Sequence, residues 1–149
     1  MTTVLNPAPA AEVPENMLGL CDYVTPNETE ASAMTGLAVG SEDEARAAAR
    51  VLRERGAGAA VITLGAEGAL FEGPGGGHLV PAFRAGPVVE TTGAGDAFNG
   101  AFAVALAEGR EAGQAVRFGC AAAGLSVTRP GTALSMPHRT EVEALLDGV

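Results

Sequence analysis

The stretch Pro87-Val-Val-Glu-Thr-Thr-Gly-Ala-Gly-Asp96-Ala-Phe-Asn-Gly-Ala101 is the best indicator of the fold, because it joins an expected strand to an expected helix. Pro87–Thr91 is predicted to be a strand, and Ala94–Ala107 a long apolar helix. A glycine-rich turn between the two places several free N–H groups at the helix N-terminus, where they attract anions. Glycine at 93 and 95 lets the backbone approach a phosphate without an intervening side chain. The stretch therefore predicts a phosphate site.

Asp96 follows this turn and has two interpretations. It could be an ordinary N-cap of the helix. It could instead accept a proton from a hydroxyl that attacks a γ-phosphate, while the N–H groups stabilise the charge on the transferring group. A dinucleotide-binding motif is rejected, because Phe98 occupies the third small position and no acidic residue ends a strand about 20 residues later.

Strands and helices are expected to alternate along the rest of the chain. Three strands are predicted at Thr3–Leu5, Asp22–Val24 and Ala59–Leu64, and a hairpin at Ala69–Phe71 and Leu79–Phe83. Helices are predicted at Pro14–Leu20, Glu28–Met34, Ser41–Arg55, Glu111–Ser126 and Thr140–Leu146. Ser41 and Glu44 are expected to form a capping box. This order predicts an α/β fold with a mainly parallel sheet and helices on both faces.

Composition narrows the classes of function. The 149 residues carry a net charge of −9, which argues against a nucleic-acid partner. No apolar run of about 18 residues predicts a membrane helix, and no secretory signal is expected. Cys21 and Cys120 show no metal spacing, which favours a reducing cytoplasm. All nine basic residues are arginines, so a Walker A lysine is absent and phosphate must be held by backbone N–H groups, arginine or a metal.

Several motifs in order carry a resemblance to a known family. Residues 91–101 resemble the C-terminal signature of the ribokinase (PfkB) carbohydrate kinases. The other matching segments are Asn6-Pro-Ala-Pro9, Thr25-Pro-Asn27-Glu28-Thr-Glu30-Ala31, Val61-Ile-Thr-Leu-Gly65-Ala-Glu-Gly68 and Val127-Thr-Arg-Pro-Gly131-Thr-Ala-Leu-Ser135-Met-Pro137. The resemblance implies that residues 1–149 form the C-terminal nucleotide-binding and catalytic part of a ribokinase-like domain. The residues flanking these motifs favour ribokinase over adenosine, fructose and deoxygluconate kinases.

The resemblance also implies roles for single residues. Asp96 would be the base that deprotonates the primary hydroxyl of a sugar, and Gly93, Ala94 and Gly95 would form the anion hole. Glu30 would organise Mg²⁺ through water, or else be a solvated acid in the first turn of its helix. The residues implied to contact ATP are Asn27, Thr63, Leu64, Gly65, Ala66, Glu67, Gly68, Gly95, Asp96 and Cys120.

A monovalent cation, K⁺, is implied beside the anion hole. The positions that correspond to this site in the family are Glu90, Thr92, Ser126, Arg129, Gly131 and Ser135. Most of them would contribute backbone carbonyl groups. The family usually has aspartate where this chain has Glu90, and the longer side chain puts potassium affinity in doubt more than catalysis.

The family resemblance further implies that this chain lacks the N-terminal half, which carries the sugar contacts and a small β lid. The chain alone is therefore expected to bind nucleotide weakly and to phosphorylate ribose poorly. It is also expected to expose a sheet edge and apolar surface, which favours self-association. The alternatives are another PfkB sugar or nucleoside kinase, and a nucleotide-binding remnant without catalysis.

Overall fold

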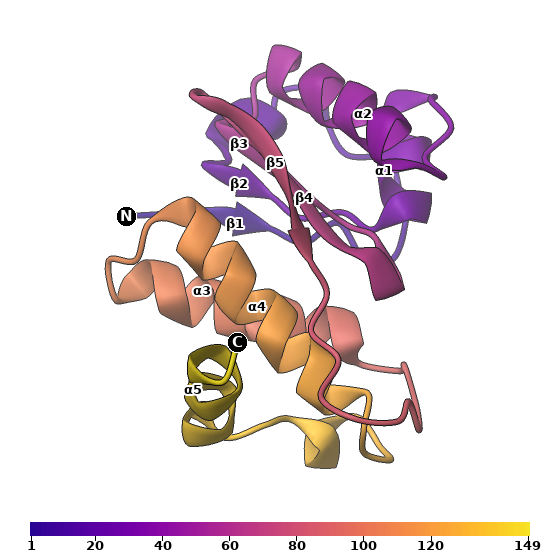
Figure 1. The fold of residues 1–149 in the computed structure, drawn as a ribbon. Coiled ribbons are helices and arrows are strands. Elements are labelled where there is room, and N and C mark those ends of the chain that lie inside the picture. Colours follow the sequence, from indigo (N-terminus) through magenta and orange to yellow (C-terminus); the bar gives the residue numbers. More distant parts are fainter. The chain divides into compact units, whose positions relative to one another are not determined.

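The chain folds into two units, residues Met1–Val80 and Pro81–Val149, and the computed structural model describes all 149 residues. We call the first the sheet unit and the second the helical unit. Figure 1 shows the course of the chain through both. None of the helices combines the length and the apolarity that a membrane crossing requires.

The sheet has five strands in the order β1-β2-β3-β4-β5. Their bounds are Val4–Leu5, Tyr23–Val24, Ala59–Thr63, Gly68–Gly73 and Gly76–Pro81. The first three strands pair in parallel, and β4 runs antiparallel to β3. The parallel side of the sheet and the hairpin that follows it confirm the predicted α/β class. Strand β1 is an edge strand, and whether this edge causes self-association stays a prediction.

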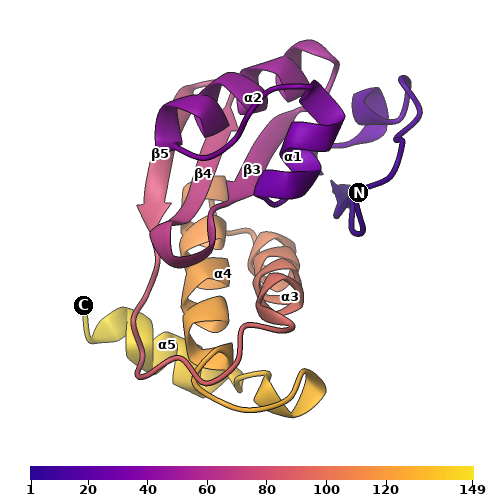
Figure 2. The ribbon, with the colours of Figure 1, turned by 90° about the vertical axis from the view of Figure 1, so that its right-hand side faces the viewer.

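Two helices, α1 (Glu28–Thr35) and α2 (Glu42–Glu54), pack against the sheet (Figures 1 and 2). Apolar residues of α2 recur at helical spacing and are fully buried against the sheet: Ala45, Ala48, Ala49 and Leu52. Ser41 accepts a hydrogen bond from Glu44 N at 3.3 Å, as a cap should. The predicted capping box is wrong in its second half, because the Glu44 carboxylate accepts from Gly40 N at 2.7 Å.

The predicted helix at Pro14–Leu20 is shorter than expected. Only Leu18–Leu20 is helical, as the 3-10 helix η1, and a turn precedes it in which Met17 N donates to Pro14 O at 2.9 Å. A three-residue 3-10 helix of this kind is a connector.

The helical unit contains α3 (Ala94–Ala107), α4 (Ala112–Ser126), the 3-10 helix η3 (Ala133–Ser135) and α5 (Arg139–Asp147). Helices α3 and α4 lie side by side (Figure 2). They approach closely at Gly119, where an added Cβ would lie 2.8 Å from the Phe98 ring. Phe102, which is fully buried, stacks on Phe98 with 5.8 Å between ring centroids. Both aromatic rings are buried and belong to the core of the helical unit.

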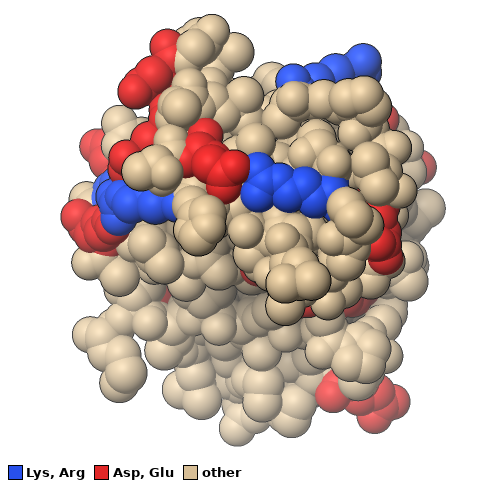
Figure 3. Space-filling model, turned by 90° about the horizontal axis from the view of Figure 1, so that it is seen from below, with Lys and Arg blue, Asp and Glu red and all other residues tan.

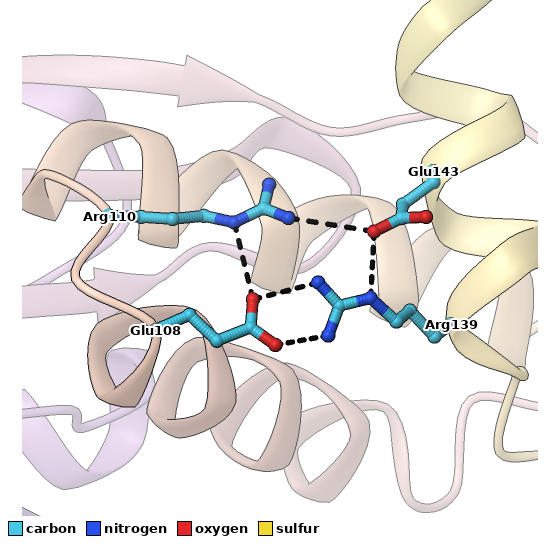
Figure 4. Close-up of polar contacts among 4 residues, drawn as sticks. All are labelled: Glu108, Arg110, Arg139 and Glu143. Atoms are coloured by element: carbon cyan, nitrogen blue, oxygen red, sulfur yellow. Dashed lines mark hydrogen bonds and ion pairs between the residues drawn. The ribbon is translucent and has the colours of Figure 1, made fainter.

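Ion pairs hold the start of α5 against the end of α3 (Figure 4). The Arg139 guanidinium donates to both carboxylate oxygens of Glu108 and to Glu143 at 2.7 Å. Arg110 lies between the two acids, 3.6 Å from Glu108 and 3.7 Å from Glu143. The hydrogen bonds from Arg139 lower the pKa of Glu108. A space-filling view of one face of the protein shows other places where arginine side chains adjoin acidic ones (Figure 3).

The predicted strand at Pro87–Thr91 is wrong, because this segment is an irregular loop. Val88 and Val89 are 67% and 59% exposed, so the apolar pattern that indicated a strand does not reflect burial. Instead of a ladder, Val89 N and Glu90 N both donate to Val127 O, at 2.7 and 3.2 Å. The loop before α3 is therefore attached to the end of α4.

Candidate active site

The N-terminus of α3 has no side-chain cap. Its N-cap is Gly93, whose φ of 85° is in the left-handed region that favours glycine. Ala97 N makes the first helical bond, to Gly93 O at 2.9 Å, and Ala94 N donates to Thr91 O at 3.2 Å. The amides of Gly95 and Asp96 donate to no other group of the protein. Two free N–H groups thus lie at the positive end of a 14-residue helix, which favours an anion there.

Asp96 is the third residue of α3 and not its N-cap, so the N-cap interpretation is wrong. Its side chain is exposed and takes part in no hydrogen bond or ion pair. A carboxylate with this freedom beside unpaired amides is available to accept a proton from a bound hydroxyl.

The loop before α3 is fixed by a side-chain contact as well as by backbone. Glu90 Oε2 accepts a hydrogen bond from Gly131 N at 2.8 Å, across 41 positions of sequence. Gly93 packs against the same loop, because a Cβ added there would lie 3.4 Å from Thr132 Cα. The residues after α4 therefore support the turn that holds the free amides.

The six residues predicted for a monovalent cation are only partly brought into contact. Glu90 and Gly131 touch, as described above. The hydroxyl groups of Ser126 and Ser135 are buried and donate to carbonyls of their own turns, at 2.8 and 2.7 Å. The Arg129 guanidinium pairs with Glu141, which lowers the pKa of that acid, and Thr92 is exposed. The serine hydroxyls and the Arg129 guanidinium are therefore engaged within the protein.

Asn27 and Glu30 bond to each other at the start of α1. Glu30 N donates to Asn27 Oδ1 at 2.8 Å, and Asn27 N donates to Glu30 Oε2 at 2.9 Å. These two bonds are a complete capping box. Glu30 is 6% exposed, so the alternative of a solvated first-turn acid is wrong. Its second oxygen, Oε1, makes no hydrogen bond within the protein.

The predicted nucleotide loop begins beside this capping box. Asn27 and Thr63 form a parallel bridge, and Thr63 N donates to Pro26 O at 3.0 Å. The loop then turns through the 3-10 helix η2 (Gly65–Glu67), whose residues are exposed, and Leu64 N donates to Gly68 O at 2.8 Å. The structure thus brings two predicted motifs together that lie 36 positions apart in the sequence.

Comparison with known proteins adds the decisive observation. Residues 1–139 match the pfkB family carbohydrate kinases. The chain belongs to this family. It is 43% identical to the ribokinase of Haemophilus influenzae over 144 residues, which cover 97% of this chain and 47% of that protein. The chain therefore spans about half the length of this curated relative.

Two solved structures of pfkB-like kinases superpose on the chain. The structure of Arabidopsis thaliana ribokinase complexed with ribose and ATP has a TM-score of 0.91 at 34% identity, and covers 97% of this chain and 47% of that chain. A putative ribokinase II from E. coli, in complex with ATP and Mg²⁺, has a TM-score of 0.78 at 26% identity, and covers 91% and 42%. These matches confirm the ribokinase-like fold.

Few side chains of this pfkB chain could hold Mg²⁺. No group of three or more His, Cys, Asp or Glu side chains gathers at one place. Mg²⁺ keeps several waters and usually takes one or two carboxylates together with the phosphates of a nucleotide. The unbonded Oε1 of Glu30 fits this mode of binding.

Cys120, the predicted adenine contact, lies in the interior of the helical unit. It is 5% exposed, and burial raises the pKa of its thiol to about 12. A neutral thiol in this place packs as a small apolar group. Its contact with adenine stays a prediction.

Sequence reasoning missed two features of this pfkB chain. The first is the bond between Glu90 and Gly131, for which the sequence carries no local signal. The second is a cavity of about 850 Å³ in the sheet unit, bordered by Ala10–Glu15, Leu18, Ala33, Met34 and Arg55. None of the predicted site residues lines this cavity.

Proposed function

We propose that this chain supplies the ATP-binding and phosphoryl-transfer part of a ribokinase, which transfers the γ-phosphate of ATP to the primary hydroxyl of D-ribose. The observation that carries the proposal is the uncapped N-terminus of α3, where two free amides lie next to the unpaired carboxylate of Asp96. The identity to a ribokinase and the likeness to a ribokinase complexed with ribose and ATP support the choice of substrates.

In this proposal Asp96 accepts the proton of the attacking hydroxyl, and the oxygen forms its bond to the γ-phosphorus as the bond to ADP breaks. The backbone at Gly93, Ala94 and Gly95 stabilises the negative charge of the transferring group. Ala94 N is bonded to Thr91 O at 3.2 Å, so Gly95 N and Asp96 N are the amides that are free for this role. Bound Mg²⁺ would neutralise charge on the phosphate oxygens.

Asn27, Glu30 and the segment Thr63–Gly68 are proposed to contact ATP. Their support is the bridge that joins Asn27 to Thr63 and the exposure of the loop that follows. A K⁺ ion is proposed at the loop after α4, held by carbonyl groups there. Its support is the contact between Glu90 and Gly131.

The test joins this chain to the half of Haemophilus influenzae ribokinase that it does not match. Release of ADP is measured with ribose, deoxyribose, fructose and adenosine as acceptors. Asp96→Asn should lower turnover with the best acceptor by about 10²–10⁴-fold and leave ATP binding unchanged. The matched control is Asp43→Asn, which changes an exposed first-turn aspartate of α2.

Two outcomes would contradict the proposal. Turnover that survives in Asp96→Asn would make Asp96 a helix residue without a catalytic role. Preference for adenosine or fructose over ribose would assign the chain to another kinase of the same family.

A further inference from the structure

Asn27 and Glu30 are bound to each other before any ligand is considered. Each side chain accepts the backbone N–H of the other residue, at 2.8 and 2.9 Å. Asn27 Oδ1 is therefore already bonded to the helix, whereas the Glu30 carboxylate uses only Oε2. Of the two residues, Glu30 is the one whose side chain has an oxygen, Oε1, that is not yet hydrogen-bonded and can face a hydrated cation.

The capping box also restricts how Glu30 can move. A free glutamate samples several rotamers, and fixing it costs conformational entropy. Here Oε2 is fixed by Asn27 N, and the residue is 6% exposed, so the carboxylate is already ordered. Asn27 is itself fixed by the bridge to Thr63 at the end of β3. The Glu30 carboxylate is thus held by the backbone N–H of Asn27, whereas the Asn27 side chain holds the backbone N–H of Glu30 and with it the start of the helix. The backbone of Asn27 is in turn held by the sheet.

We propose that Asn27 is a positioning residue, which acts on magnesium-nucleotide binding through Glu30 and not as a ligand. The inference rests on the proposed function, because it assigns Glu30 Oε1 to the hydrated Mg²⁺ of the nucleotide. It goes further because it couples the stability of the start of α1 to the position of the carboxylate that binds the metal. Loss of the cap then weakens metal binding even though no ligand atom is removed.

The experiment uses the whole 149-residue chain labelled with ¹⁵N, which is small enough at 14.8 kDa for amide spectra. The probe is the non-hydrolysable analogue β,γ-imido-ATP, titrated with MgCl₂ or with EDTA. Affinity is read from the amide signals of the segment Thr63–Gly68. Exchange of the Glu30 amide with solvent reports the cap separately.

Three variants separate positioning from ligation. Asn27→Ala removes the oxygen that accepts the Glu30 N–H and keeps the backbone N–H that holds Glu30 Oε2. The start of the helix should loosen, so the Glu30 amide should exchange about fivefold faster. The magnesium-dependent part of the affinity should fall roughly 10- to 100-fold, as for other residues that orient a metal ligand. Asn27→Ser keeps a capping oxygen but shortens the side chain and should restore both values. Glu30→Gln should abolish the difference between MgCl₂ and EDTA.

The matched control is Ser41→Ala, which removes the side-chain cap of α2. It should speed the exchange of the Glu44 amide without changing the effect of magnesium. Affinity that is unchanged in Asn27→Ala, or lost equally in Asn27→Ser, would overturn the positioning role and leave the proposed function intact. If magnesium does not change the affinity of the wild-type chain, or still changes it in Glu30→Gln, then Glu30 does not bind the metal and the metal role in the proposed function fails.

Discussion

Replacing Glu90 tests how the phosphate turn is held. Its Oε2 accepts the Gly131 N–H at 2.8 Å, and this is the side-chain bond between the loop before α3 and the loop after α4. A hydrogen bond to a charged group contributes about 1.5–3 kcal/mol, and the partial exposure of Glu90 favours the lower end. At about 1.4 kcal/mol for each factor of ten, Glu90→Ala should speed exchange of the Gly131 amide roughly tenfold.

Two further substitutions at Glu90 separate reach from charge. Glu90→Asp removes one methylene and withdraws the oxygen by roughly 1.5 Å, which carries it beyond hydrogen-bond distance of Gly131 N. It should therefore behave like alanine. Glu90→Gln keeps the reach and loses the charge, so exchange should rise only about two- to fivefold, as for the loss of charge from a hydrogen bond.

Exchange is measured by amide spectra of each variant at one pH and temperature. Asp147→Ala, an exposed acid at the end of α5, controls for the change in net charge. The Glu90 amide, which donates to Val127 O, should stay protected in every variant. If Glu90→Asp exchanges at the wild-type rate, the bond does not depend on the longer side chain and the reasoning is refuted.

Two other predictions follow from shifted pKa values. Hydrogen bonds from the backbone N–H and the hydroxyl of Thr3 lower the pKa of Asp22, so its contribution to stability is present above the unfolded pKa of about 3.9 and is lost below it. Asp22→Asn should therefore lower the urea midpoint at pH 7 and have less effect at pH 3; an equal effect at both pH values would contradict this. Burial raises the pKa of Cys120 to about 12, so iodoacetamide at pH 8 should modify the half-buried Cys21 first and Cys120 only after unfolding. Mass spectrometry of the peptides measures the rate at which each cysteine is alkylated, and equal rates for Cys21 and Cys120 would contradict the burial of Cys120.

The parts of the fold that the sequence predicted well are those whose local pattern matches their burial. Helix α3 has the bounds that were predicted, and β3 differs from its prediction by one residue. The segment Pro87–Thr91 failed for the opposite reason. Its valines are apolar but exposed, because a strand needs a neighbour to pair with and this loop bonds to a single carbonyl, Val127 O. Pro87 in addition has no N–H to donate.

The contacts at the candidate site could not be predicted from the sequence. The spacing of Asn27 and Glu30 is also that of a capping box, which the structure shows to be formed. The same rule predicted a box at Ser41 and Glu44, where the glutamate bonds one residue earlier, at Gly40. Spacing alone cannot choose between two adjacent N–H groups. The bond from Gly131 N to Glu90 joins residues 41 positions apart, so no rule on local sequence spacing could predict it.

The start of α3 differs from those of α1, α2 and α5 in a way that favours a ligand over a structural role. Helix α4 (Ala112–Ser126) has no side-chain cap either, but its N-cap is Glu111 in an extended conformation and not a glycine with positive φ. At the starts of α1, α2 and α5, the side chains of Asn27, Ser41 and Glu141 respectively accept a hydrogen bond from a backbone N–H. At α3 the N-cap is Gly93, which has no side chain to accept one. Alanine at this position would be strained, because the φ of 85° lies in a region that L side chains rarely adopt. A glycine N-cap with positive φ therefore leaves the amides of Gly95 and Asp96 without an acceptor in the protein. The unpaired carboxylate of Asp96 lies at the same helix start, so an anion and a hydroxyl could both be bound there.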